Sequence, residues 1–221
     1  MPEKFKKYTH FMLIYSKTKF KLLAKEFFRK SIHMCSAFIP LFLKVNYLFT
    51  VVALIAALVV YIICEILRLK GINVPVISEV TEIASRKRDE NRFVLGPVTL
   101  VLGILVSAIF FKSPASTVGI FALSFGDGLA SLSGKCFGKI KVPLSQGKTV
   151  AGCITCFLAI FISSFLVLWF YSGTIVYHFS YCAISLILAS VGMFIELLPI
   201  KDFDNLIIPF LISLICSLCL N

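Results

Sequence analysis

Long apolar runs alternate with short polar segments along nearly the whole chain. Six of these runs approach the roughly 20 residues that a helix needs to cross a hydrocarbon core of about 30 Å. They cover Leu48 to Leu67, Phe93 to Phe111, Pro114 to Ser133, Val150 to Tyr171, Phe179 to Pro199 and Leu206 to Leu220. A shorter run, Ile32 to Leu43, spans only if the preceding residues FFRKS extend it, and otherwise is re-entrant. The pattern predicts an all-α fold, that of a polytopic membrane protein.

Composition supports the same class. Of the 221 residues, 59% are hydrophobic and only 15% are charged, with a mean hydropathy of +0.96, which lies far outside the range of soluble domains. The polar segments are too short to fold separately. We therefore expect a basic cytoplasmic N-terminal segment over residues 1–30 and one multi-pass transmembrane domain, carrying any catalysis, over residues 31–221.

Lysine and arginine gather at alternate ends of the predicted spans. Twenty of the 22 basic residues lie in the N-terminal segment and in three loops on one side, whereas the other side keeps only Lys44 and Lys112. Cytoplasmic loops are enriched in basic residues. The alternation predicts about seven transmembrane helices with a cytoplasmic N-terminus, and it favours counting the short run as a span.

Three acidic residues, Glu65, Asp127 and Glu196, fall inside or at the cytoplasmic ends of predicted spans. A carboxylate at that depth costs a few kcal/mol unless it is paired or faces a polar cavity, so each is a candidate functional residue. The eight cysteines are spread over the spans and one loop. Two C-x-x-C pairs lie in apolar helices without a nearby histidine, and we interpret them as packing residues rather than zinc ligands.

The fourth predicted span carries a pattern of small residues around Asp127. Gly126, Ala130 and Gly134 recur every four residues, so they form a stripe that lets another helix approach closely. Gly126 and Gly128 flank the acid and leave room for an ion or a ligand. The alternative is that Asp127 pairs with a basic residue and only joins helices.

The loop after this span, GKCFGKIKVPLSQGKT, holds four lysines together with glycines and a proline. Neither GK pair completes a P-loop, because Leu129 and Val142 stand where the first glycine is required. Lysines in such a loop often serve topology or contact anionic headgroups. The glycines and Pro143 favour instead a folded loop whose amides and lysines surround phosphate, with a carboxylate holding Mg²⁺.

Three motifs in order along the chain carry a family resemblance. The stretch GDGLASLSGKCFGKIKVPLSQGKTVAG resembles the signature of the polyprenol kinase family, which includes dolichol kinase, phytol kinase and CTP-dependent diacylglycerol kinases. RKSIHM, residues 29–34, is similar to the family's R-K-x-x-H, and ELLPIKDFDNLIIP, residues 196–209, is similar to its E-x-x-P-x-x-x-x-D-N segment. The resemblance implies phosphoryl transfer, typically from CTP, to the hydroxyl of a membrane lipid alcohol.

The resemblance also implies a set of site residues. The expected catalytic residues are Arg29, Lys30, Asp127, Lys135, Lys148 and Asp204. The expected nucleotide-binding residues are Gly126, Gly128, Gly134, Gly138, Lys139, Thr149 and Asn205. Asp127 is the expected ligand of Mg²⁺ or another divalent cation, with Glu196 or Asp204 as a second carboxylate. Asp204 and His33 are alternative bases for the lipid hydroxyl.

Two other functions stay open. A phosphatidate cytidylyltransferase also consumes CTP, but its K-T-x-E-G stretch is absent because Val150 and Ala151 follow KT. A non-enzymatic transporter would explain the hydropathy but not the three motifs that resemble the kinase family.

The expected partners are the lipid alcohol, the nucleotide and the bilayer, without nucleic acid. The expected location is a bacterial cell membrane or an ER-type membrane, with the active site facing the cytoplasm. Neither the particular alcohol nor the oligomeric state follows from the sequence.

Overall fold

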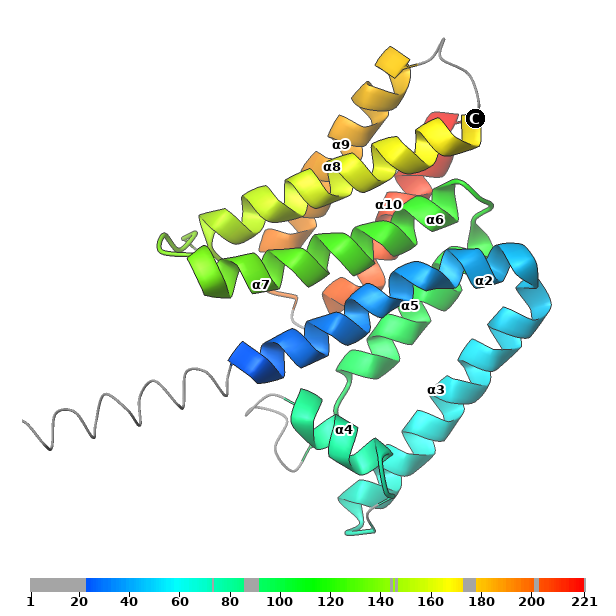
Figure 1. Ribbon diagram of the computed structural model, residues 1–221, viewed down its shortest axis with the longest axis vertical. Helices are drawn as coiled ribbons and strands as arrows, with labels where there is room; N and C mark the ends of the chain where they lie inside the picture. Colours follow the sequence, from blue (N-terminus) through cyan, green and yellow to red (C-terminus); the bar gives the residue numbers. More distant parts are fainter. Residues whose placement is uncertain are drawn as a thin grey trace, which may run out of the picture.

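The computed structural model describes residues 23–72, 74–85, 92–143, 145, 147–172, 178–200 and 203–220. In these residues the regular structure is helical, apart from one isolated antiparallel bridge between Lys141 and Thr149 (Figure 1). The predicted all-α class is therefore confirmed.

The helices follow one another with short connections. After a helix over residues 23–35 come η1 (Ser36–Phe38), α2 (Ile39–Val45), α3 (Tyr47–Leu69), α4 (Ile77–Ala84), α5 (Gly96–Phe110), α6 (Ala115–Phe121), the π-helical segment η3 (Ala122–Asp127), α7 (Gly128–Phe137), α8 (Val150–Ser172), α9 (His178–Leu197) and α10 (Asp204–Leu220). Several ends carry local signals. Asn46 accepts a hydrogen bond from the Phe49 amide at the start of α3, and proline stands in the first turns of α2 and α5.

The first helical run is longer than its apolar core. Helix 23–35, η1 and α2 continue from one to the next, so FFRKS does extend the short run Ile32 to Leu43. Residues 30 and 31, where the two predicted segments meet, both lie inside this helix. Glu26, Lys30 and His33 lie four and three residues apart, on one face, and all three are buried.

Four helices are long and apolar enough to cross a membrane, among the residues that the structure describes. They are Tyr47–Leu69, Ala115–Phe137, Val150–Tyr171 and Ser180–Leu197, and Gly96–Phe110 and Asp204–Leu220 are shorter apolar helices. These helices agree with the predicted membrane class. The count of seven spans and the orientation of the N-terminus stay predictions.

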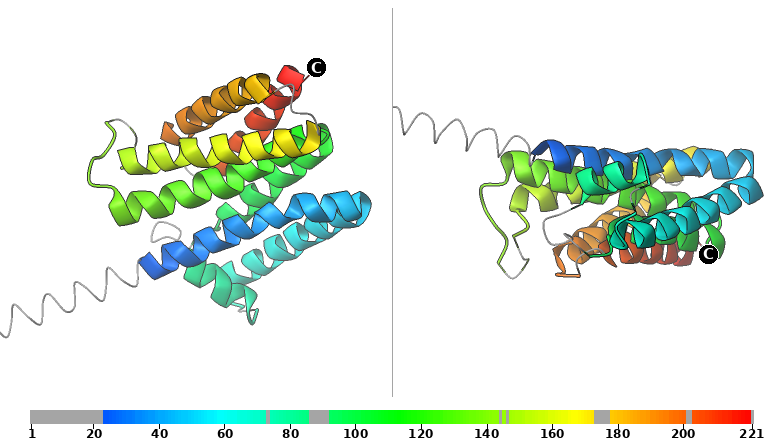
Figure 2. Two further views of the ribbon diagram at one scale, coloured as in Figure 1. Left: turned by 45° about the horizontal axis from the view of Figure 1, so that its top comes forward. Right: turned by 90° about the horizontal axis from the view of Figure 1, so that it is seen from below.

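The stretch formed by α6, η3 and α7 is the central helix of the bundle. In the 18-residue apolar segment of this helix 72% of the residues are buried. In the corresponding segment of α3, which lies at the periphery, 11% are buried (Figures 1 and 2). Small residues bring α8 close. A Cβ atom on Gly152 would lie 2.9 Å from the carbonyl oxygen of Ala130, and one on Gly126 would lie 2.8 Å from Cγ1 of Ile160. The predicted close approach along the small-residue stripe is confirmed.

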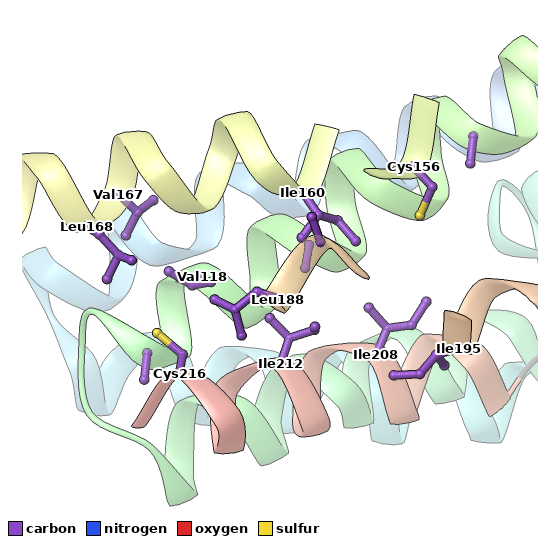
Figure 3. Close-up of a cluster of buried hydrophobic side chains, with 14 residues drawn as sticks. Val118, Cys156, Ile160, Val167, Leu168, Leu188, Ile195, Ile208, Ile212 and Cys216 are labelled. Atoms are coloured by element: carbon purple, nitrogen blue, oxygen red, sulfur yellow. The ribbon is translucent and has the colours of Figure 1, made fainter. Parts of the chain in front are cut away.

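An apolar cluster joins the central helix to α8, α9 and α10 (Figure 3). Ile160, Leu188 and Ile212 are fully buried at its centre. Cys156 and Cys216 belong to the same cluster, and none of the eight cysteines, all of which the structure describes, forms a disulfide. The interpretation of these two cysteines as packing residues is confirmed.

Candidate active site

Three carboxylates from distant parts of the sequence converge at one end of the bundle. Asp127 ends the π-helical segment, Glu196 lies in the last turn of α9, and Asp204 begins α10. Each offers an oxygen, and the three oxygens lie within 4.8 Å of one another. Ligands on opposite sides of a Mg²⁺ ion are about 4.2 Å apart, because each Mg–O bond is about 2.1 Å. At least two of the three pairs would be neighbouring ligands, which are about 3 Å apart in octahedral geometry, so the trio could hold a hard cation once its oxygens move closer together.

The burial of these groups supports the same interpretation. Asp127 is 4% exposed and Glu196 is 5% exposed. Within the described part of the chain, Oε2 of Glu196 is buried and has no hydrogen-bond partner. Leaving a buried charged oxygen unpaired is costly. A bound cation would satisfy it.

Helix 23–35 supplies basic side chains to the central carboxylate. Lys30 Nζ lies 2.5 Å from Oδ2 of Asp127, and Nδ1 of His33 lies 3.2 Å from the same oxygen. All three side chains are buried. The alternative in which Asp127 pairs with a basic residue is thus observed, and it coexists with the carboxylate cluster.

Lys148 closes the cluster from the loop before α8. Its Nζ atom lies 2.6 Å from Oε1 of Glu196 and 4.0 Å from Oδ2 of Asp204. Burial would lower the pKa of Lys148, but the attraction and hydrogen bond to Glu196, with the charges of Asp204 and Asp127, together outweigh this effect and raise the pKa above its ordinary value. Its neighbour Thr149 accepts a hydrogen bond from the Gly152 amide and so caps α8.

A second polar network borders the first. Glu26 accepts hydrogen bonds from Arg29 and Ser131, each at 2.5 Å, and from Lys135. Burial would raise the pKa of Glu26, but Arg29, Lys135 and Ser131 together lower it from 4.5 to about 2. The sequence reasoning missed Glu26. Its position one helical turn before Lys30, on the same face, was the available signal.

One cavity of about 310 Å³ unites the two networks. Its wall includes Arg29, Lys30, Asp127, Gly134, Lys135, Lys148, Thr149 and Glu196 from the predicted set, together with Glu26, Ala130, Ser131, Gly147, Gly152 and Cys153. Four basic side chains and three carboxylates thus face a space of small-ligand size. This arrangement can hold a phosphate-bearing ligand with its cation.

The remaining predicted residues lie elsewhere. Asp204 belongs to the carboxylate cluster but does not line the cavity, and Lys139 is exposed outside the cavity. Asn205 donates hydrogen bonds to Thr99 and to the Gly96 carbonyl, so it ties α10 to α5. Its side chain therefore serves the packing of two helices.

The flanking glycines differ from the expectation that they leave room for a ligand. A Cβ atom on Gly126 would meet Ile160, and one on Gly128 would lie 3.1 Å from Met34. A Cβ atom on Gly138 would lie 2.2 Å from the carbonyl oxygen of Gly134. The space beside these glycines is filled by the protein itself, and none of the three lines the cavity.

Glu65, the third intramembrane acid, lies in a different environment. Both of its oxygens accept hydrogen bonds from Arg68 at 2.8 Å, and Oε1 also accepts one from the Val94 amide. These bonds satisfy the buried carboxylate and join α3 to the segment before α5. Glu65 is therefore a structural residue.

Several proteins similar to this chain are named phytol kinases. It is 30% identical to phytol kinase 1, chloroplastic, of Arabidopsis thaliana over 64% of this chain and 49% of that protein. It is 27% identical to a probable phytol kinase 1 of rice over 86% of this chain and 63% of that protein. An uncharacterised protein of Methanocaldococcus jannaschii is 28% identical over 89% of this chain and 95% of its own length. The chain thus spans about half of the Arabidopsis enzyme.

No family model and no solved structure matches the chain. The fold and the site define a helical membrane protein with a carboxylate and lysine cluster at one end of its bundle. The similarity to several phytol kinases, at 25–30% identity, supports a polyprenol/phytol kinase-type family for this chain.

Proposed function

We propose that the protein is a lipid kinase that transfers the terminal phosphoryl group of a nucleoside triphosphate to the hydroxyl of a membrane alcohol. The observation that carries the proposal is the convergence of Asp127, Glu196 and Asp204 beside Lys148. Carboxylates that hold a cation and basic groups that face phosphate are the two parts that phosphoryl transfer requires. The names of the related phytol kinases support the same activity.

The proposed donor is CTP, and this choice rests on the family resemblance. Arg29, Lys30, Lys135 and Lys148 line one cavity, so they would offset the negative charge of the triphosphate. In the structure these cations are paired with Glu26, Asp127 and Glu196. We infer that the phosphates compete with these carboxylates for the same basic groups.

The trio of carboxylates would hold the divalent cation. When bound, Mg²⁺ supplies charge neutralisation at the β- and γ-phosphate oxygens. Asp127 would keep its oxygens directed to the ion, because Lys30 and His33 fix the position of the side chain. Positioning and charge stabilisation would then provide most of the rate, as is usual for phosphoryl transfer.

The chemistry exchanges one P–O bond for another. The oxygen of the lipid hydroxyl forms a bond to the γ-phosphorus while the bond to the bridging oxygen breaks and CDP leaves. The hydroxyl proton passes to a nearby base, for which Asp204 and His33 are the two candidates. The proposed acceptor is phytol or a related polyprenol, with diacylglycerol as the alternative, since each presents one hydroxyl above an apolar body.

The position of the label in the product tests this function. Purified protein is incubated with Mg²⁺, one lipid acceptor (phytol, polyprenol, diacylglycerol or phosphatidate), and CTP labelled on either the α- or the γ-phosphorus. Label in the lipid from γ-labelled CTP alone is the expected result, with CTP turned over faster than ATP. Label in the lipid from α-labelled CTP would identify a cytidylyltransferase. Absence of labelled lipid from both forms of CTP, with every alcohol and with phosphatidate, would reject both enzymes.

A further inference from the structure

The end of the bundle opposite to the carboxylate cluster has a cavity of its own, of about 590 Å³. The end of α2 and the start of α3 form one wall, and the connection between α5 and α6 forms another. Tyr171, near the end of α8, completes it. In Figure 1 this region lies where α2 turns into α3 and where α6 begins.

The two basic residues that the charge pattern leaves on this side, Lys44 and Lys112, both line this cavity. They are 68 positions apart in the sequence, and the fold brings them to one site. Both side chains are exposed, and no acidic residue lines the cavity in the described part of the chain. No ion pair of either lysine occurs among the described residues. These cations are available to a ligand, in contrast to those of the candidate active site.

The rest of the wall combines hydroxyl and apolar groups. Ser113, Ser116, Thr117 and two tyrosines contribute hydroxyls, while Leu43, Ile109, Phe110 and Phe111 contribute apolar surface. Phe110 is 72% exposed at the end of α5. Lysines and hydroxyls suit phosphate oxygens, and the adjoining apolar side chains suit the first carbons of an acyl chain.

We propose that this cavity binds the phosphate headgroup of an anionic phospholipid. The site is distinct from the candidate active site and does not depend on the proposed kinase activity. Each lysine at a membrane surface multiplies the affinity for anionic lipid by about five. Two lysines therefore favour an anionic lipid over a zwitterionic one by roughly twenty-five-fold at this position.

The single tryptophan of the chain provides a local probe. Trp169 precedes Tyr171 by two residues on α8, which is a rise of about 3 Å along the helix. Bromine atoms on lipid acyl chains quench a nearby indole. The purified full chain is placed in phosphatidylcholine nanodiscs that contain a small fraction of either brominated phosphatidylglycerol or brominated phosphatidylcholine, and Trp169 fluorescence is recorded.

The expected result is stronger quenching by the brominated anionic lipid than by the zwitterionic one at equal fraction. The double variant K44Q/K112Q should lose this excess, and K44R/K112R should keep it. A matched control, K70Q/K141Q, removes two exposed lysines elsewhere and should also keep it. Melting temperatures of all variants check that the fold is intact.

Three outcomes would overturn the proposal. The first is equal quenching by the two lipids in the unmodified chain. The second is an excess that survives in a folded K44Q/K112Q variant. The third is removal of the excess by millimolar inorganic phosphate, which would identify a site for free phosphate instead.

Discussion

Nζ of Lys148 lies 2.6 Å from Oε1 of Glu196, and this contact joins the loop before α8 to the last turn of α9. The same ammonium lies 4.0 Å from Asp204 at the start of α10. One lysine thus connects three elements at the carboxylate cluster. It holds two carboxylates near each other that would otherwise repel, and it lines the cavity where we place the phosphates.

The first prediction concerns this lysine. Lys148→Met should lower turnover roughly a hundredfold, the scale of losing one preorganised charge-stabilising group, and Lys148→Arg should retain part of the activity. Lys70→Met, which removes an exposed lysine at the end of α3, is the control and should leave turnover unchanged. Turnover of the Lys148→Met variant within twofold of the unmodified protein would exclude Lys148 from the reaction.

The charge of Lys148 also determines a pH dependence. Because folding raises its pKa, the stabilisation is complete below the ordinary pKa of lysine and is lost only as pH rises through the raised value. Activity should therefore show no alkaline decline from this group between pH 7 and 9. A decline in that range that disappears in Lys148→Arg would contradict this assignment.

Glu26 gives a prediction at acid pH. Its pKa is lowered in the folded protein from 4.5 to about 2. The stabilisation is therefore present above 4.5 and is lost as pH falls toward 2. The melting temperature should fall less steeply between pH 5 and pH 3 in Glu26→Gln than in the unmodified protein. Parallel curves would show that the bonds to Arg29, Ser131 and Lys135 do not stabilise the fold.

Glycine packing at α5 provides a prediction on stability. A Cβ atom on Gly103 would lie 2.2 Å from the backbone carbonyl oxygen of Asn205, so Gly103→Ala must displace α10. We expect a loss of about 1–3 kcal/mol in the free energy of unfolding, measured as a lower melting temperature. Gly96→Ala is the matched control, since a Cβ atom there meets nothing within 4 Å. Equal melting temperatures of the two variants would contradict the packing of α5 against α10.

The orientation in the membrane is tested by labelling. In a cysteine-free background, a cysteine replacing Ser113 should react with an impermeant thiol reagent applied from outside, and one replacing Lys139 should not. Both positions are exposed in the structure, so accessibility across the membrane is the variable. Labelling at position 139 from outside would overturn the predicted cytoplasmic active site.

The helices were predictable because the bilayer fixes their length. Predicted and observed bounds agree within a few residues, as for Leu48 to Leu67 against Tyr47–Leu69. The fourth span was predicted to end at Ser133, yet its helix continues to Phe137. Its last turn contains Gly134 and Lys135, whose low hydropathy ends the apolar pattern although the helix continues. Tertiary contacts stabilise this last turn.

The residues of the site could be predicted only where a charged residue lies within one of the three family motifs. Asp127 and Glu196 were identified from their depth in the predicted spans, and Lys148 was identified from its loop and from the family resemblance. Glu26 was missed because its partners lie more than 100 positions away on α7, at Ser131 and Lys135. The close helix approach predicted at Gly126 is observed, but the room expected there for a ligand is filled by Ile160, which only the fold reveals.

The central claim is that Asp127 acts as a cation ligand in phosphoryl transfer. Asp127→Asn keeps the size of the side chain and most of its hydrogen bonds but removes the charge that holds a hard cation. Glu65→Gln is the matched control, because Glu65 is also buried and ion-paired but lies outside the cavity. The control should lose stability and keep its turnover per folded molecule.

The most direct measurement is the turnover of folded Asp127→Asn protein as a function of Mg²⁺ concentration, with the melting temperature recorded in parallel. Turnover at limiting Mg²⁺ is expected to fall at least about a hundredfold, with the protein still folded. A stable Asp127→Asn variant with near-normal turnover at limiting Mg²⁺ would contradict the account. If Asp127→Asn lowers only the melting temperature, as Glu65→Gln should, then the role of Asp127 is to join two helices through its ion pair with Lys30.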